Sequence, residues 1–153
     1  MKIFCDTNII MEYLQQRSQA SLVGEILSFS SSRGDELFIS SGSFYTITYL
    51  VEGYLKRDKQ LQGSEKLREL REILNSVLDS FQIADSMTSS MKDGVNDEEF
   101  SDLEDSYQAH IAEDACCDVL LTINKRHFEN FAKSSSVVVY APTDFIDKLI
   151  LNK

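Results

Sequence analysis

The chain has 153 residues, of which 42% are hydrophobic, and carries a formal net charge of −10. This length accommodates one domain with a full core, and no apolar run approaches the roughly 20 residues of a membrane-spanning helix. The first residues lack the basic segment and apolar core of a secretory signal. The cysteines, Cys5, Cys116 and Cys117, show neither a disulfide framework nor zinc-ligand spacing, which predicts buried free thiols. We therefore expect a single domain over residues 1–153 in the cytoplasm.

Charge is distributed unevenly along the chain. Six of the fifteen basic residues fall in one short region: Lys56, Arg57, Lys59, Lys66, Arg68 and Arg71. Residues 93–105 instead hold seven acids and no basic residue. The negative total argues against a nucleic-acid partner, but the basic cluster keeps that partner possible. The acidic run is typical of a solvated face or of the wall of a cation site.

Short apolar segments alternate with amphipathic ones in chain order. Strands are expected at 3–5, 36–40, 81–84, 119–122 and 137–140. Helices are expected at 9–14, 20–29, 43–56, 64–78, 87–91, 102–115, 124–131 and 144–151. Residues 43–56 are rich in strand formers, but Phe44, Ile47, Val51 and Leu55 keep helical spacing, which favours a helix with Ser43 as its N-cap. The alternation predicts a parallel sheet covered by helices on both faces.

Parallel topology places polar residues of distant segments at one edge of the sheet. Because crossovers are right-handed, a helix that follows a strand begins at the carboxyl end of that strand. The positions expected along this edge are Asp6, 41–46, Asp85, 102–105 and Asn124. Asp102 and Asp105 are expected to share the face of a first helical turn and to point at Asp6. The competing interpretation is that Asp6, Thr7 or Asn8 merely caps the next helix.

Carboxylates gathered at an exposed edge repel one another unless a cation lies between them. Asp and Asn oxygens are hard ligands that suit Mg²⁺ or Mn²⁺, and such an ion can promote cleavage of a phosphodiester. The sequence has no glycine-rich phosphate loop, no nucleophile elbow and no zinc-binding histidine pair. His110 and His127, which have no evident partners in the sequence, are expected to be structural or on the surface.

Three sequence blocks resemble the PIN-domain family of metal-dependent ribonucleases, and in particular the small bacterial branch related to VapC-type toxins. The blocks are Phe4-Cys-Asp-Thr-Asn-Ile-Ile10, Asp102-Leu-Glu-Asp-Ser-Tyr-Gln108 and Leu121-Thr-Ile-Asn-Lys-Arg-His-Phe128, and the resemblance continues to Ala141-Pro-Thr-Asp-Phe145. It implies a three-layer α/β/α sandwich with a mainly parallel sheet of about five strands. It also implies a Mg²⁺- or Mn²⁺-dependent endoribonuclease that acts on RNA, is commonly a homodimer and is held inactive by an antitoxin.

The resemblance assigns roles to particular residues. Asp6, Asp105 and Asp102 correspond to the acids that bind the metal and carry catalysis. Supporting positions at the same site are Thr7, Asn8, Asn124 and Thr46. Asn124 takes the place of a fourth acid, which in this branch is often Asn.

Three departures from the family pattern keep an alternative open. Thr46 stands where many members carry Glu, His127 where many carry Asp, and Ile123 where Arg is usual. Because lost carboxylates weaken binding of divalent cations, the alternative is a catalytically weakened PIN-like domain that serves as an RNA-binding or protein-interaction module.

A phosphotransfer protein is a third class. Haloacid-dehalogenase-like phosphatases need a second Asp where Asn8 stands, and response-regulator receivers need an acidic pair where Cys5 and Asp6 stand. Both classes are disfavoured by these residues.

The aromatic residues Tyr45, Tyr49 and Tyr54 precede the basic cluster and permit two interpretations. They can face RNA by stacking, or they can lie in the core and in a dimer interface. The second is favoured at this point because aromatic side chains are enriched at interfaces.

Overall fold

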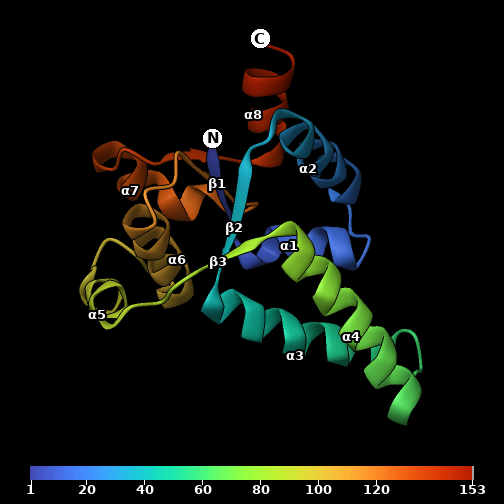
Figure 1. Ribbon diagram of the computed structural model, residues 1–153. Helices are drawn as coiled ribbons and strands as arrows, with labels where there is room; N and C mark the ends of the chain where they lie inside the picture. The colour runs from blue at the N-terminus through green and yellow to red at the C-terminus, as the bar shows by residue number, and fades with distance from the viewer. Residues whose placement is uncertain (153) are drawn as a thin grey trace.

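A sheet of five parallel strands forms the centre of the computed structural model, which describes residues 1–152 (Figure 1). The strands are β1 (Lys2–Cys5), β2 (Glu36–Ser40), β3 (Gln82–Ala84), β4 (Val119–Leu121) and β5 (Val138–Tyr140). Their order across the sheet is β3-β2-β1-β4-β5, and every neighbouring pair is parallel. The predicted parallel α/β sheet is therefore confirmed, with β1 at its centre.

Both faces of the sheet are buried at the central strands β1 and β4, which explains why these strands are almost continuously apolar, whereas the edge strands β3 and β5 carry exposed residues. Ile3 and Cys5 of β1 belong to one hydrophobic core, whereas Phe4 belongs to the other. In β4, Leu121 and Leu120 are divided between the same two cores. A strand whose neighbouring side chains both enter a core cannot show polar alternation.

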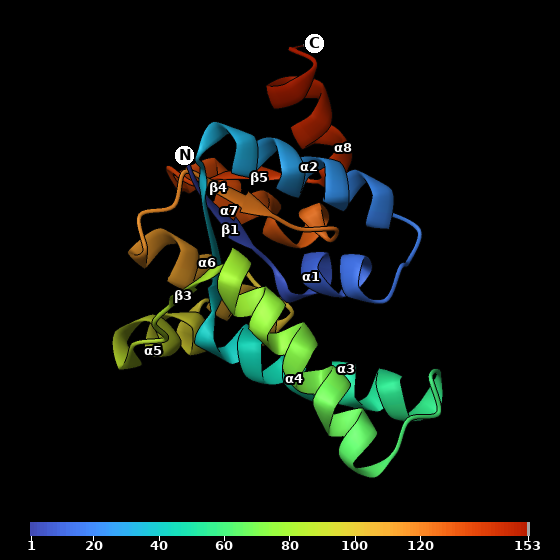
Figure 2. The ribbon, with the colours of Figure 1, turned by 45° about the vertical axis from the view of Figure 1, so that its right-hand side comes forward.

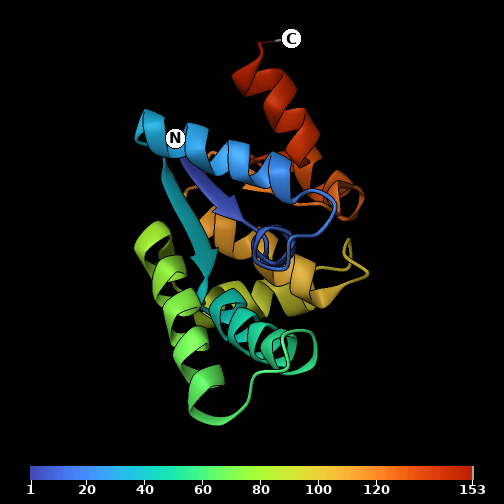
Figure 3. The same ribbon diagram turned by 90° about the vertical axis from the view of Figure 1, so that its right-hand side faces the viewer.

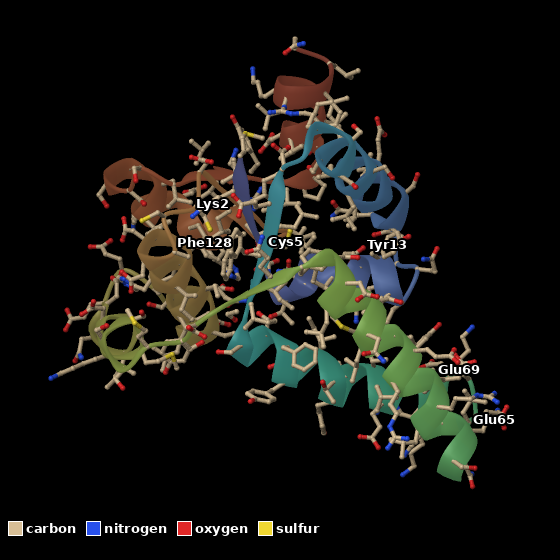
Figure 4. All side chains as sticks on the ribbon, in the orientation of Figure 1. Lys2, Cys5, Tyr13, Glu65, Glu69 and Phe128 are labelled. Atoms are coloured by element: carbon tan, nitrogen blue, oxygen red, sulfur yellow. The ribbon has the colours of Figure 1, made fainter. Side chains whose placement is uncertain are left out.

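Helices form a layer on each face of the sheet, as the three-layer expectation requires. The helical segments are α1 (Thr7–Leu14), α2 (Ala20–Arg33), α3 (Ser41–Arg57), α4 (Gly63–Ser80), α5 (Thr88–Asn96), α6 (Leu103–Asp114), η1 (Lys125–Phe128), α7 (Glu129–Ser134), α8 (Pro142–Phe145) and η2 (Ile146–Ile150). Helices α5, α6 and α7 cover one face, and α1, α2, α4 and α8 cover the other (Figure 1). Figure 4 shows Phe128 beside α6, on the opposite side of β1 from Tyr13 of α1.

Helices α3 and α4 form a hairpin whose far end projects beyond the sheet (Figure 2). Helix α3 forms despite its strand-forming residues because Ile47, Val51 and Leu55, four residues apart, are all buried against the core. The helix begins at Ser41, and its N-cap is Ser40, whose Oγ accepts a hydrogen bond from the Ser43 amide at 2.9 Å. The prediction of Ser43 as the cap is therefore wrong by one helical turn.

Other boundaries differ from the sequence-based prediction for local reasons. Helix α2 does not end at Phe29 but continues to Arg33, because Ser30 is buried and Gly34 (φ 72°) provides the left-handed C-cap. Helix α5 is longer than predicted, and α8 begins at Pro142, whose fixed φ suits a first helical turn.

The structure bears on the predictions about the cysteines and about membrane-spanning segments. Cys5 and Cys117 are buried, but Cys116 is exposed at a left-handed turn (φ 54°), so the prediction of three buried thiols is wrong for that residue. Across residues 1–152, none of the helices combines the length and the apolar composition required to cross a bilayer. The cytoplasmic location stays a prediction.

Candidate active site

A cavity of about 240 Å³ opens at the carboxyl edge of the sheet, where β1 and β4 end and α3 and α6 begin. All seven residues that the sequence singled out line it: Asp6, Thr7, Asn8, Thr46, Asp102, Asp105 and Asn124. Four further residues complete the lining: Met11, Arg17, Leu50 and Glu104. The predicted convergence of these distant segments is thus observed, whereas Asp85 lies outside the cavity and is exposed.

Asp6 follows β1 directly and is held there by the sheet, since its amide donates to the Leu121 carbonyl of β4 at 2.9 Å. Its Oδ2 accepts hydrogen bonds from Thr122 Oγ1 at 2.8 Å and Asn8 Nδ2 at 2.9 Å. Its Oδ1 accepts from Gln108 Nε2 at 3.2 Å. Although Asp6 occupies the N-cap position of α1, its side chain makes no capping hydrogen bond within the described chain. Asp6 thus stands at the N-cap position, but its carboxylate bonds to Thr122, Asn8 and Gln108, which capping alone does not explain.

Gln108 of α6 connects the residues around Asp6 into one buried network. Its Nε2 also donates to Ser43 Oγ at 2.6 Å and Thr7 Oγ1 at 3.2 Å, and its Oε1 accepts from Ser40 Oγ at 2.8 Å. The side chain is 2% exposed, so these partners replace water entirely. The sequence offered one unused signal: Gln108 lies three residues after Asp105, on the same helical face.

Helix α6 begins one residue later than predicted, and this changes the role of Asp102. Asp102 is the N-cap, and its Oδ1 accepts from the amides of Glu104 at 2.9 Å and Asp105 at 3.3 Å. Asp102 therefore lies just before the helix and not within it, whereas Asp102 and Asp105 both line the cavity with Asp6. Asp102 is exposed on the cavity rim, whereas Asp105 is 7% exposed and lies deeper.

Glu104 brings a carboxylate into the cavity that the sequence did not single out. Its Oε1 accepts a hydrogen bond from Thr7 Oγ1 at 3.3 Å. Glu104 and Thr46 line the same cavity, so α6 contributes a carboxylate to it and α3 contributes a hydroxyl. Within a long acidic run, the sequence gives no basis for choosing this Glu over its neighbours.

The acids in the cavity disfavour one another's charge. Desolvation raises the pKa of Asp6 above its ordinary value, the hydrogen bonds from Thr122 and Gln108 oppose that rise, and the charge of Asp105 adds to it. Burial likewise raises the pKa of Asp105 and of Glu104, and the negative charge of Asp6 adds to the rise at Glu104. A cation between these groups would remove the repulsion.

His127 has a partner that the sequence did not reveal. Its Nδ1 lies 2.6 Å from Asp105 Oδ2, and the hydrogen bond it forms partly offsets the raised pKa of Asp105. His127 is thus a neighbour of the site and not an isolated surface residue. His110 contacts Asp97 at 2.8 Å, away from the cavity, in keeping with a structural role.

The chemistry of the lining fits a hard divalent cation. The available donors are carboxylate, amide and hydroxyl oxygens, which Mg²⁺ and Mn²⁺ prefer. Within residues 1–152, no three His, Cys, Asp or Glu side chains are already clustered as a closed metal site. Proteins commonly hold Mg²⁺ through a few carboxylates, with water in its remaining positions.

Comparison with known proteins gives one family and a set of similar structures. The sequence profile of the PIN domain matches residues 2–126. VapBC2 from Rickettsia felis, bound to a DNA fragment from its promoter, is similar with a TM-score of 0.65 and 15% identity, covering 92% of this chain and 98% of that one.

Two further structures are similar at a TM-score of 0.66 and 22% identity: FitAcB from Neisseria gonorrhoeae, and FitAB bound to an IR36 DNA fragment. Each covers 92% of this chain, with 98% and 94% of the matched chains covered in return. At these identities the likeness concerns the fold. No curated protein sequence matches the chain. Since the profile spans most of the chain and the fold agrees with it, the protein belongs to the PIN-domain family.

Proposed function

We propose that the protein is a divalent-metal-dependent endoribonuclease that cleaves RNA phosphodiester bonds as the toxin of a toxin–antitoxin pair. The observation that carries this proposal is the buried Asp6 carboxylate, whose pKa is raised by desolvation and by the charge of Asp105. Placing two mutually repelling acids at a solvent-accessible edge is costly unless a cation binds there. Membership of the PIN-domain family supports the same activity.

In this proposal, Asp6 and Asp105 hold the cation. Asp102 contributes through Oδ2, since its Oδ1 caps α6, and Glu104 adds a further carboxylate. When bound, Mg²⁺ or Mn²⁺ supplies a Lewis acid that offsets the charge developing on the scissile phosphate.

The surrounding side chains orient the ligands and the substrate. Gln108 and Thr122 fix the Asp6 carboxylate, and His127 fixes that of Asp105. Arg17, exposed on the cavity wall, offers a guanidinium for a substrate phosphate, and Asn124 offers a neutral oxygen.

The direct test is cleavage of a structured RNA by purified protein with Mn²⁺, compared with Asp6→Asn. We expect Asp6→Asn to lose most of the activity, because the isosteric amide keeps the volume but removes the charge. Asp85→Asn is the matched control, since Asp85 ends β3 at the same edge but lies outside the cavity. Equal cleavage by the wild type and Asp6→Asn would reject the assignment.

A catalytically weakened PIN-like scaffold is the second candidate, favoured by one observation: Thr46 places a hydroxyl in the cavity wall where a family acid is common. Such a protein would bind RNA or a protein without cutting. Titration calorimetry separates the two, because failure to bind Mg²⁺ or Mn²⁺ at millimolar concentration would favour the scaffold.

We also propose that the protein pairs with an antitoxin and forms a homodimer. The resemblance to VapC-type toxins supports both, and the similarity to the chain in the VapBC2 complex supports the antitoxin. Light scattering tests the dimer against the 17.4 kDa mass of one chain. Co-purification with the product of an adjacent gene tests the antitoxin.

A further inference from the structure

A second hollow lies on the α3–α4 hairpin, beyond the acidic cavity. It has a volume of about 250 Å³ and is lined by Tyr49, Leu50, Glu52, Gly53, Lys56, Arg57 and Lys66. Glu52 is neutralised by Lys66, with Nζ and Oε1 2.9 Å apart. Lys56 and Arg57 have no ion-pair partner among residues 1–152, so the hollow carries net positive charge in a protein whose total is −10.

A glycine shapes this hollow. A Cβ at Gly53 would lie 2.9 Å from a terminal nitrogen of Arg57, so the bare backbone allows the guanidinium to lie against α3. Arg57, although exposed, lies with its guanidinium along the wall of the hollow.

The basic hollow adjoins the acidic cavity along α3. Leu50 lines both, and Thr46, one turn earlier, lines the acidic cavity. The surface thus leads from the carboxylates, past Leu50, to Lys56 and Arg57. Figure 3 shows α3 and α4 side by side along this hairpin.

Two tyrosines extend from the same stretch of helix. Tyr45 and Tyr49 are 74% and 77% exposed and lie one helical turn apart, next to Thr46 and Leu50. Exposing two large aromatic rings to water costs free energy unless a ligand covers them. Tyr54, by contrast, packs against the core, with the Lys59 ammonium 5.7 Å from its ring centroid.

This inference rests on the ribonuclease function proposed above. We propose that one surface holds a single-stranded segment of the RNA that enters the acidic cavity. The surface is formed by Tyr45, Tyr49, Lys56 and Arg57. Bases stack on the two rings, and the phosphates beyond them lie at the two cations. An aromatic platform beside a basic groove is the usual surface for single-stranded nucleic acid, because every base has a π-face and every linkage an anion.

Charge favours RNA over a second copy of the chain as the occupant. Lys56 and Arg57 have no ion-pair partner among residues 1–152, and the phosphates of RNA supply anions that complement them. We therefore favour the RNA-facing interpretation for Tyr45 and Tyr49, and a dimer interface at this surface is an outcome that the test distinguishes.

The test measures binding without cleavage. Full-length Asp6→Asn protein is titrated, in the presence of a chelator, against a short fluorescent single-stranded RNA and, separately, a fluorescent polyglutamate peptide. In this background, Tyr45→Ala and Tyr49→Ala should each weaken RNA binding by about fivefold or more, and Phe at either position should restore it. Lys56→Gln with Arg57→Gln should reduce the slope of log affinity against log salt by about 1.4 for RNA.

The matched control is Lys92→Gln with Lys133→Gln, which removes two exposed cations from α5 and α7 on the other face of the sheet. It should leave the slope unchanged. RNA affinity that is insensitive to all the α3 variants would overturn the proposal. So would variants that weaken polyglutamate binding alone, which would indicate an acidic protein partner, or variants that dissociate a dimer while RNA affinity persists.

These outcomes are distinct from failure of the nuclease assignment. If the wild-type protein cleaves RNA and the tyrosine and cation variants have the same KM as the wild type, the proposed surface is rejected and the nuclease assignment stands. RNA binding that depends on the surface, in a protein that never cleaves, would keep the surface and reject the nuclease.

Discussion

At the scale of single residues, the site depends on carboxylates that the fold holds apart from water. Asp6 is 3% exposed and Asp105 is 7% exposed, yet both line an open cavity. Three hydrogen bonds compensate the Asp6 carboxylate, and one from His127 compensates Asp105. These contacts orient the acids toward fixed directions, as the outer hydrogen bonds of a metal site do.

The raised pKa of Asp6 predicts a pH-dependent effect of Asp6→Asn on stability. A carboxyl whose folded pKa is raised contributes stability below its unfolded pKa and loses it as pH rises through the folded value. In the absence of divalent cations, Asp6→Asn should therefore become progressively more stable relative to the wild type as pH rises from acidic to neutral. Urea unfolding at several pH values measures the difference, with Asp85→Asn as a control. A difference that stays constant or falls with pH would contradict the raised pKa.

The buried network around Gln108 predicts a large cost for removing its amide. Gln108→Met keeps the approximate volume but removes the hydrogen bond to the buried Asp6 Oδ1 and one hydrogen bond each from Ser40 Oγ and Ser43 Oγ. We expect a loss of about 2–4 kcal/mol in the free energy of unfolding, since each unsatisfied buried group costs roughly 1–3 kcal/mol. Gln82→Met is the control, because Gln82 is exposed on β3, and it should change stability by less than about 0.5 kcal/mol. Equal effects of the two substitutions would show that the network is not stabilising.

At the scale of elements, α3 and α6 bring the site together. Helix α3 leaves the sheet at Ser40 and places Thr46 and Leu50 on one side of the cavity. Helix α6 leaves its cap at Asp102 and places Glu104 and Asp105 on another side. The packing of α6 against α5 fixes the direction of α6. Gly94 of α5 allows the two helices to approach closely.

Two helical glycines should respond to alanine with opposite signs. A Cβ at Gly94 of α5 would lie 2.6 Å from Cδ1 of the Tyr107 ring and 3.4 Å from the Tyr107 Cα, so α5 and α6 would have to separate. Gly94→Ala should therefore destabilise the protein by about 1–3 kcal/mol despite the higher helix propensity of alanine.

At Gly53 the Cβ would meet only the flexible end of Arg57, which can move aside. Gly53→Ala should therefore stabilise α3 by about 0.5–1 kcal/mol. Chemical denaturation of both variants measures the two signs, and destabilisation by Gly53→Ala would show that the Arg57 contact is rigid.

At the scale of the whole molecule, the fold concentrates opposite charges on neighbouring surfaces. The acidic cavity lies at the end of the sheet, and the basic hollow lies on the hairpin beside it. The labelled Glu65 and Glu69 occupy the outer part of α4, near the tip of that hairpin (Figure 4). A net charge of −10 is therefore compatible with a polyanionic ligand, because a bound ligand interacts mainly with the charges nearest to it.

A divalent cation should stabilise the whole fold. At neutral pH, Mn²⁺ at ten times its Kd should add about 1.4 kcal/mol to the free energy of unfolding, because it binds the folded state. The gain should shrink as pH falls through the raised pKa values of Asp6 and Asp105, since protonated carboxyls do not bind the ion. Thermal unfolding with and without Mn²⁺ measures the effect. Asp6→Asn should abolish it, and an equal gain in that variant would place the cation elsewhere.

Residue patterns were sufficient to predict the element order, the parallel sheet and the edge at which Asp6, Asp105 and Asn124 meet. Each of these follows from local burial patterns together with the handedness of crossovers, which any chain of this pattern obeys. The helix over 43–56 was also predictable, since Ile47, Val51 and Leu55 recur at helical spacing in a segment of strand formers.

The roles of the individual acids became visible in the folded chain. That Asp102 caps α6 while it also lines the cavity depends on a helix start that is shifted by one residue, and sequence patterns do not resolve such shifts. The contacts of Gln108 with Ser40, and of His127 with Asp105, join segments 68 and 22 residues apart. Periodicity reports which side of an element is buried, whereas the partner of a buried polar group is set by packing between elements, and that packing exists only in the folded chain.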